Sequence, residues 1–190
     1  MDIVKTDAVC AAAFELAKAH LLTSILNHSI RVFLYAASQS GPSRNLFVAC
    51  IMHDFGTVDE LCNGPCRFEV EGADRAVSLM ESQSQPKEDC HEVWVAIALH
   101  TSPQIAERIS ELAKTVRLAV LRDFHQGLAI DEGLERTYPR LQIEKDLGDA
   151  VVRQCLLGDP KMKAPAASWP NNLYKSHTEN PGWEGINKGF

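Results

Sequence analysis

Apolar residues recur at spacings of three and four along most of the chain, which is the period of an amphipathic helix. In the first twenty residues the repeat runs through Val4, Ala8, Ala11, Ala12, Leu16 and Ala19. Cap and turn residues divide the later pattern into separate elements. The predicted helices cover about 4–19, 23–40, 43–53, 72–82, 86–100, 102–112, 116–128 and 131–157.

Residues that favour helix starts support these divisions. Thr23 or Ser24 can cap the second helix, and Ser43 can cap the third. Ser102-Pro103 is typical of an N-cap followed by proline at the first helical position. The stretch 58–71 contains a Gly-Pro pair and two cysteines, so we expect a loop there.

The character of the chain changes near its end. The last helical stretch is interrupted near Tyr138-Pro139, and from Asp159 onward prolines and tryptophans become frequent while the helical period disappears. No internal repeat and no βαβ alternation is visible. We therefore expect one all-α domain, a helical bundle over residues 1–158, followed by an irregular tail, 159–190, that packs on the domain through its aromatic residues.

Composition agrees with a single globular domain and narrows the partners. The 190 residues are 45% hydrophobic and 23% charged, which suffices for a substantial core. The net charge of −6, with scattered basic residues, argues against a nucleic-acid binder. No signal-peptide pattern or apolar run of about 18 residues is present, so we expect a cytoplasmic protein without a membrane partner. We expect a small-molecule substrate, and homo-oligomerisation stays open.

The six cysteines fit a reducing compartment. Cys62 and Cys66 are four residues apart and could form half of a zinc site, but no second pair has a matching spacing. The other four lie in or beside apolar segments, where a free cysteine behaves as a small hydrophobic residue.

The pair His53-Asp54 is the first sign of chemistry, because it ends the apolar run 46–52. His28 lies 25 residues before His53, and Asp123 lies 69 residues after Asp54. Imidazole and carboxylate groups are good ligands for zinc or iron. A carboxylate in the apolar segment around Asp123 needs a metal or an ion pair, for which Arg117 or Arg122 is an alternative partner. These four residues predict a site for one divalent metal.

The order of these residues resembles the signature of the HD-domain superfamily of metal-dependent hydrolases. Five further blocks look like its cyanamide hydratase-type branch: 67–73, 96–103, 116–124, 168–170 and 183–187. The resemblance extends over roughly residues 20–187. It implies an all-α HD-domain bundle in which His28, His53, Asp54 and Asp123 bind one metal ion, with Zn²⁺ expected first and Fe²⁺ also compatible.

The resemblance also implies an activity. A divalent metal lowers the pKa of bound water toward neutrality, and the resulting hydroxide would add to a small nitrile such as cyanamide to give urea. Asp54 and His100 are then the expected catalytic residues, with His100 as a proton carrier or substrate donor. His100 also has a structural interpretation, because it ends a predicted helix and the helix dipole favours a cationic histidine at that end. Thr57, Glu69 and Thr101 are the expected substrate-binding residues, although Thr101 could simply cap a helix.

Three other functions stay open. A phosphohydrolase of nucleotides or small phosphate esters is disfavoured by Thr57, since some members of the superfamily that cleave nucleotides have Glu there. A dinuclear iron oxygenase would need two further histidines, but His91 and His100 are nine residues apart, about 13 Å along a helix. A non-catalytic ligand-binding HD domain would be marked by a lost metal ligand, whereas all four candidates are present.

Residues around the expected site have both a functional and a structural interpretation. Arg31 could hold a carboxylate ligand in place or lie on a solvated helix face. His125 is expected to be structural. Trp169 and Trp183 are expected to pin the tail, and a tail folded over the mouth of the site would restrict it to small substrates.

Overall fold

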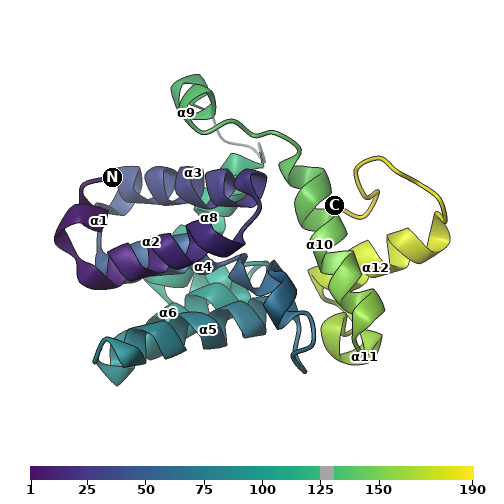
Figure 1. Cartoon of the computed structure of the whole chain (residues 1–190), viewed down its shortest axis with the longest axis horizontal. Coiled ribbons are helices and arrows are strands. Elements are labelled where there is room, and N and C mark those ends of the chain that lie inside the picture. Colours follow the sequence, from purple (N-terminus) through teal and green to yellow (C-terminus); the bar gives the residue numbers. More distant parts are fainter. Residues whose placement is uncertain (125–130) are drawn as a thin grey trace.

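A computed structural model describes residues 1–124 and 131–190 (Figure 1). In these residues the regular structure is helical and no strand occurs, which confirms the all-α class. None of the described helices is both long and apolar enough to cross a lipid bilayer. The elements are α1 (Ile3–Thr6), α2 (Ala8–His20), α3 (Thr23–Ser40), α4 (Arg44–Met52), η1 (Phe55–Thr57), η2 (Asp59–Leu61), α5 (Phe68–Ser82), α6 (Lys87–Leu99), α7 (Ala106–Ile109), α8 (Glu111–Asp123), α9 (Glu132–Thr137), α10 (Ile143–Leu157), α11 (Pro160–Lys163) and α12 (Trp169–Glu179), where η denotes a 3₁₀ helix.

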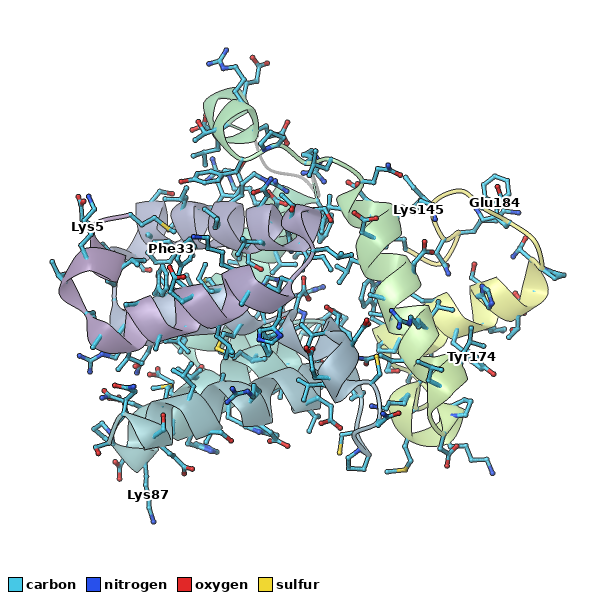
Figure 2. All side chains as sticks on the ribbon, in the orientation of Figure 1. Lys5, Phe33, Lys87, Lys145, Tyr174 and Glu184 are labelled. Carbon is cyan, nitrogen blue, oxygen red and sulfur yellow. The ribbon has the colours of Figure 1, made fainter. Side chains whose placement is uncertain are left out.

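Helix α4 is the centre of the bundle. Its residues 46–52 are all buried, because a helix that is apolar on every side must be covered on every side. Helices α2, α3, α5, α6 and α8 pack against it. Phe33 of α3 meets Phe47 of α4 edge to face, with ring centroids 4.8 Å apart. Phe33 lies inside the bundle, whereas Lys5 and Lys87 extend outward (Figure 2).

The C-terminal helices form a second layer at one end of the molecule (Figure 1). Helix α10 packs against α12, α11 and α3. The prediction that 159–190 is irregular throughout is wrong for α11 and α12, while residues 180–190 form no helix. The reason is local: Ser168 caps α12 by accepting from the backbone N–H of Asn171, and Pro170 lies in the first turn, where its missing N–H costs nothing.

Two other predicted helix starts differ from the structure. Helix α5 begins at Phe68, so the predicted loop is shorter than 58–71. Acidic residues in the first turn favour this earlier start. Ser102-Pro103 begins no long helix. Only the single turn α7 follows, because Ser110 adopts an extended backbone and caps α8 through the N–H of Ala113.

Of the predicted caps before α3 and α4, only the second is confirmed. Ser43 accepts from the N–H of Leu46, whereas Leu22 occupies the N-cap position of α3. The hydroxyl of Ser24 instead donates to Asp146 of α10, which ties the two helices together. The predicted helix 116–128 corresponds to α8, and its last part, with His125, lies outside the described residues.

Candidate metal centre

The expected metal ligands converge from three helices. His28 lies on the buried face of α3, His53 and Asp54 follow the last residue of α4, and Asp123 is the last residue of α8. All four side chains are at most 1% exposed. The convergence follows from packing, because α3 lies against both α4 and α8.

Three of these side chains direct ligand atoms at one another. Nε2 of His28 lies 3.1 Å from Nε2 of His53. Oδ2 of Asp54 lies 3.2 Å from the His53 nitrogen and 3.6 Å from the His28 nitrogen. One ligand atom from each residue falls within 4.8 Å of the others, so this buried group could hold a metal ion.

The hydrogen bonds behind the rings determine where their protons lie. Nδ1 of His53 is 2.7 Å from the carbonyl oxygen of Cys50, which can only accept, so Nδ1 carries a proton. Nδ1 of His28 is 2.6 Å from a carboxylate oxygen of Asp123 and donates in the same way. In the neutral rings both Nε2 atoms then carry lone pairs, which is the form that binds metal.

Asp54 supplies the observation that fits a cation best. Its Oδ2 is buried and has no hydrogen-bond partner among residues 1–124 and 131–190. A buried carboxylate oxygen left unpaired is costly, and two facing nitrogen lone pairs repel one another. A divalent cation would satisfy all three atoms at once, and the set of two imidazoles and a carboxylate suits zinc or iron.

The pKa shifts of His28, His53 and Asp54 follow from their burial and from the short distances between them. Burial lowers the pKa of His28, although the nearby Asp123 opposes this effect. Burial also opposes a charge on His53, but the adjacent Asp54 carboxylate outweighs it and raises the pKa of this histidine. For Asp54, burial opposes ionisation, yet the imidazoles of His53 and His100 hold its pKa well below the ordinary range.

Asp123 contacts the site through His28. Arg31 is fully buried and donates from Nε to Oδ1 and from Nη2 to Oδ2 of Asp123, each at 2.7 Å. Arg31 therefore holds the Asp123 carboxylate and does not lie on a solvated helix face. Arg117 instead donates to the carbonyl of His100. Asp123 lies outside the three-residue group, so its direct ligation of the metal stays a prediction.

Two arginine contacts around Asp123 were not visible in the sequence. Nη1 of Arg31 donates to the carbonyl oxygen of Tyr138 at 2.8 Å. Nη1 of Arg140 donates to the backbone carbonyl of Asp123 at 2.5 Å and lies 3.6 Å from its Oδ2. Both arginines tie the end of α8 to the segment before α10, which no helical period could reveal.

His100 faces the centre from the end of α6. Its Nδ1 donates to the carbonyl oxygen of Ile97 at 2.7 Å, and its Nε2 lies 3.5 Å from Oδ1 of Asp54. The structure thus brings the two expected catalytic residues together. His91 is exposed on the same helix, far from the buried His100, so this pair does not form a second metal site.

The three expected substrate-binding residues have different positions. Thr101 lines the cavity beside the metal group. Glu69 is fully buried behind it and accepts from the Thr101 hydroxyl at 2.6 Å and from Arg67. The hydroxyl of Thr57 donates to the carbonyl of Asp54 at 2.7 Å, and Thr57 lines a separate cavity. Thr101 is therefore placed to contact a ligand, whereas the other two support the surrounding backbone and side chains.

A cavity of about 370 Å³ opens from the metal group. Its inner wall is formed by His28, His53, Asp54 and His100. The C-terminal segment supplies the opposite wall, with Trp169, Asn172 and Phe190 among its residues. The tail therefore forms part of the site, and its aromatic residues were the only sequence signal for this.

The chain matches no protein-family model, and a search of curated proteins finds no significant match. Membership of the HD-domain superfamily therefore stays a prediction. The fold and site define an all-α protein with a buried His/His/Asp group that could hold a metal ion beside a cavity.

Proposed function

We propose that this protein is a metal-dependent hydro-lyase that adds water to a small nitrile, with cyanamide giving urea as the reference reaction. The observation that supports this most is the unpartnered Oδ2 of Asp54, buried between two imidazole nitrogens at the wall of the cavity. The sequence blocks similar to cyanamide hydratases supply the choice of nitrile chemistry.

His28, His53 and Asp54 would hold the ion, with Asp123 as a fourth ligand or as the group that orients His28. A zinc or iron ion there would lower the pKa of water and act as a Lewis acid toward the nitrile nitrogen. The side chains around it are buried, which limits the access of bulk water to these contacts.

His100 is suited to move a proton. Hydration adds the water oxygen to the nitrile carbon and transfers both water protons to nitrogen, so a group must take a proton and return it. Nδ1 of His100 is occupied by the Ile97 carbonyl, which leaves Nε2 as the atom that exchanges protons. This atom faces Asp54 and the cavity.

Thr101 is suited to orient the substrate. Its hydroxyl proton is committed to the buried Glu69, so toward the cavity the oxygen can only accept. An accepting oxygen complements the amino group of cyanamide. Arg67 donates to both Glu69 and Thr101 and keeps this arrangement in one orientation.

A second candidate function is hydrolysis of a phosphate ester. Arg117 lines the cavity and is the feature that favours it, because guanidinium groups bind phosphate well. Its Nη1 already donates to the His100 carbonyl, and its Nε lies 3.5 Å from Glu107, which reduces its availability. Phosphate release from a panel of esters separates the two functions, since hydration releases none.

The test is a metal measurement combined with a urea assay. Purified protein is expected to contain about one zinc or iron per chain and to convert cyanamide to urea. Chelation and the Asp54→Ala variant are expected to abolish activity, whereas Asp149→Ala, which removes an exposed carboxylate on α10, is expected to retain it. Full activity after rigorous metal removal would contradict the mechanism.

A further inference from the structure

Seven aromatic rings form a closed circuit of contacts, and all of them except Phe68 line the cavity. Adjacent rings in the circuit have centroids between 4.6 and 6.0 Å apart, mostly edge to face. Such contacts hold rings in defined orientations. In order, the rings belong to His28, Phe124, Phe190, Trp169, Phe68, His100 and His53.

Phe190 closes this circuit from the C-terminal segment. Its ring lies 5.2 Å from Phe124 and 5.4 Å from Trp169. The chain leaves α12, turns back and brings this segment beside α10 (Figure 1). Any Cβ added to Gly148 of α10 would lie 3.5 Å from the Phe190 ring, so the ring rests on this helix.

The Asn187 side chain and the close approach of Gly189 to α12 hold Phe190 in place. The Asn187 side chain donates to the carbonyl of Leu173 at 3.0 Å and accepts from the N–H of Gly189 at 2.8 Å. Gly189 approaches α12 so closely that a Cβ there would lie 2.5 Å from the carbonyl oxygen of Asn172. Position 189 therefore accepts only glycine if Phe190 is to keep its place.

The cavity is larger than cyanamide requires, and away from the metal group its lining combines a set of apolar side chains with the polar Arg117, Ser168 and Asn172. Cyanamide has the size of about three water molecules, or about 90 Å³ at liquid density. The cavity measures about 370 Å³. Its outer wall includes six apolar side chains, from Val120, Leu121, Phe124, Leu147, Trp169 and Phe190.

We infer that this site selects substrates that carry an apolar group of several carbons beside the nitrile, and that Phe190 determines this selectivity. The inference rests on the proposed function for the reaction and on the cavity for the substrate class. For an N-alkyl cyanamide, water adds across the carbon–nitrogen triple bond and the product is the N-alkyl urea, with no other reactant or leaving group.

Binding and turnover test the inference separately. Calorimetry with butylurea and urea, the two products, measures recognition of the alkyl group without any reaction. We expect butylurea to bind at least about tenfold more tightly than urea, as an apolar pocket discriminates added methylenes. Turnover of butylcyanamide and cyanamide, as kcat/KM, is expected to show the same preference.

Two variants and one control assign the effect to Phe190. Phe190→Ala and Gly189→Ala are each expected to reduce the butyl preference about tenfold, the first by deleting the ring and the second by displacing it. Phe14→Ala removes a ring from α2, outside the cavity, and is expected to leave the preference unchanged. Circular dichroism verifies that each variant is folded.

The outcomes distinguish the inference from the proposed function. Butylurea binding without any hydration would support the apolar pocket while contradicting the hydratase. Cyanamide hydration with equal binding of urea and butylurea would overturn the inference alone. Tighter binding of 4-ureidobutanoate than of butylurea would also overturn it, because the cationic Arg117 and not the apolar wall would then select the ligand.

Discussion

The buried ion pair between Arg31 and Asp123 allows the sharpest test of the structure. Asp123→Ala removes the acceptor of both Arg31 bonds, and Arg31 itself is fully buried. In the part of the chain that the structure describes, the remaining partner of Arg31 is the Tyr138 carbonyl. Removing one partner of a buried pair costs about 3–5 kcal/mol, because the other charge stays buried without compensation. The Nδ1 proton of His28 also loses its acceptor.

The magnitude is measurable by urea unfolding followed through the helical circular dichroism signal. The experiment is done in chelator, so that metal binding does not contribute to the stability. A loss of about 4 kcal/mol corresponds to a drop in Tm of about 8–16 °C for a chain of this size. Asp149→Ala removes the partner of Lys145 on the surface and should cost less than about 1 kcal/mol.

A second variant separates the ion pair from other effects of the substitution. Arg31→Met combined with Asp123→Leu removes both charges, so at least about half of the stability lost in Asp123→Ala should return. If Asp123→Ala costs less than about 1 kcal/mol, the reasoning is refuted, because Arg31 would then have access to water or to another anion.

Three further predictions concern the same region. If Asp123 acts through His28, Asp123→Asn should weaken zinc binding about 10–100-fold, and His53→Ala should weaken it much more. A chelator-competition titration measures both affinities. Equal losses in the two variants would identify Asp123 as a direct ligand. Burial opposes ionisation of Asp123, but His28 and Arg31 hold its pKa below the ordinary value. The contribution of the Asp123 carboxylate to the free energy of unfolding is therefore complete above about pH 4 and is lost as the pH falls below that value. The difference in this free energy between the native protein and Asp123→Ala should become smaller in acid. A constant difference between about pH 7 and about pH 3 would contradict this reasoning. Gly56→Ala should cost more than about 3 kcal/mol in urea unfolding, because the new Cβ would lie 1.8 Å from the Phe68 carbonyl oxygen, whereas the closest contact in Gly148→Ala is 3.5 Å and little change is expected.

The sequence predicts the parts of the fold that local patterns determine. The helical period identifies the all-α class, and the apolar run 46–52 is buried as the central helix. The prediction of an irregular tail is wrong at α12 because it treats the frequent prolines as helix breakers. Pro170 instead lies in the first turn of α12, behind the cap at Ser168, where proline is compatible with a helix. The predicted helix 72–82 is shorter than α5 for a similar reason, because the Gly-Pro pair lies near the end of the loop and does not extend it to residue 71.

For the site, sequence order identifies groups but not their distances. His28, His53 and Asp54 are brought together as the pattern predicts. Sequence spacing cannot show whether Asp123 faces a metal or the far nitrogen of His28, because the two arrangements differ by the width of one imidazole ring. The contribution of Phe190 was equally hidden, since it depends on the return of the C-terminal segment to α10 and α12.

The hydrogen bonds behind the three imidazoles also determine how the centre can change by mutation. His53 and His100 are oriented by backbone carbonyls three residues earlier, and no side-chain substitution can remove a carbonyl. His28 alone is oriented by a side chain, that of Asp123. Among these three rings, only that of His28 therefore has a basicity and an orientation that depend on a residue that mutation can change, Asp123. Substitutions at position 123 could therefore adjust the affinity of this group for a metal ion, while His53 and His100 keep their orientation.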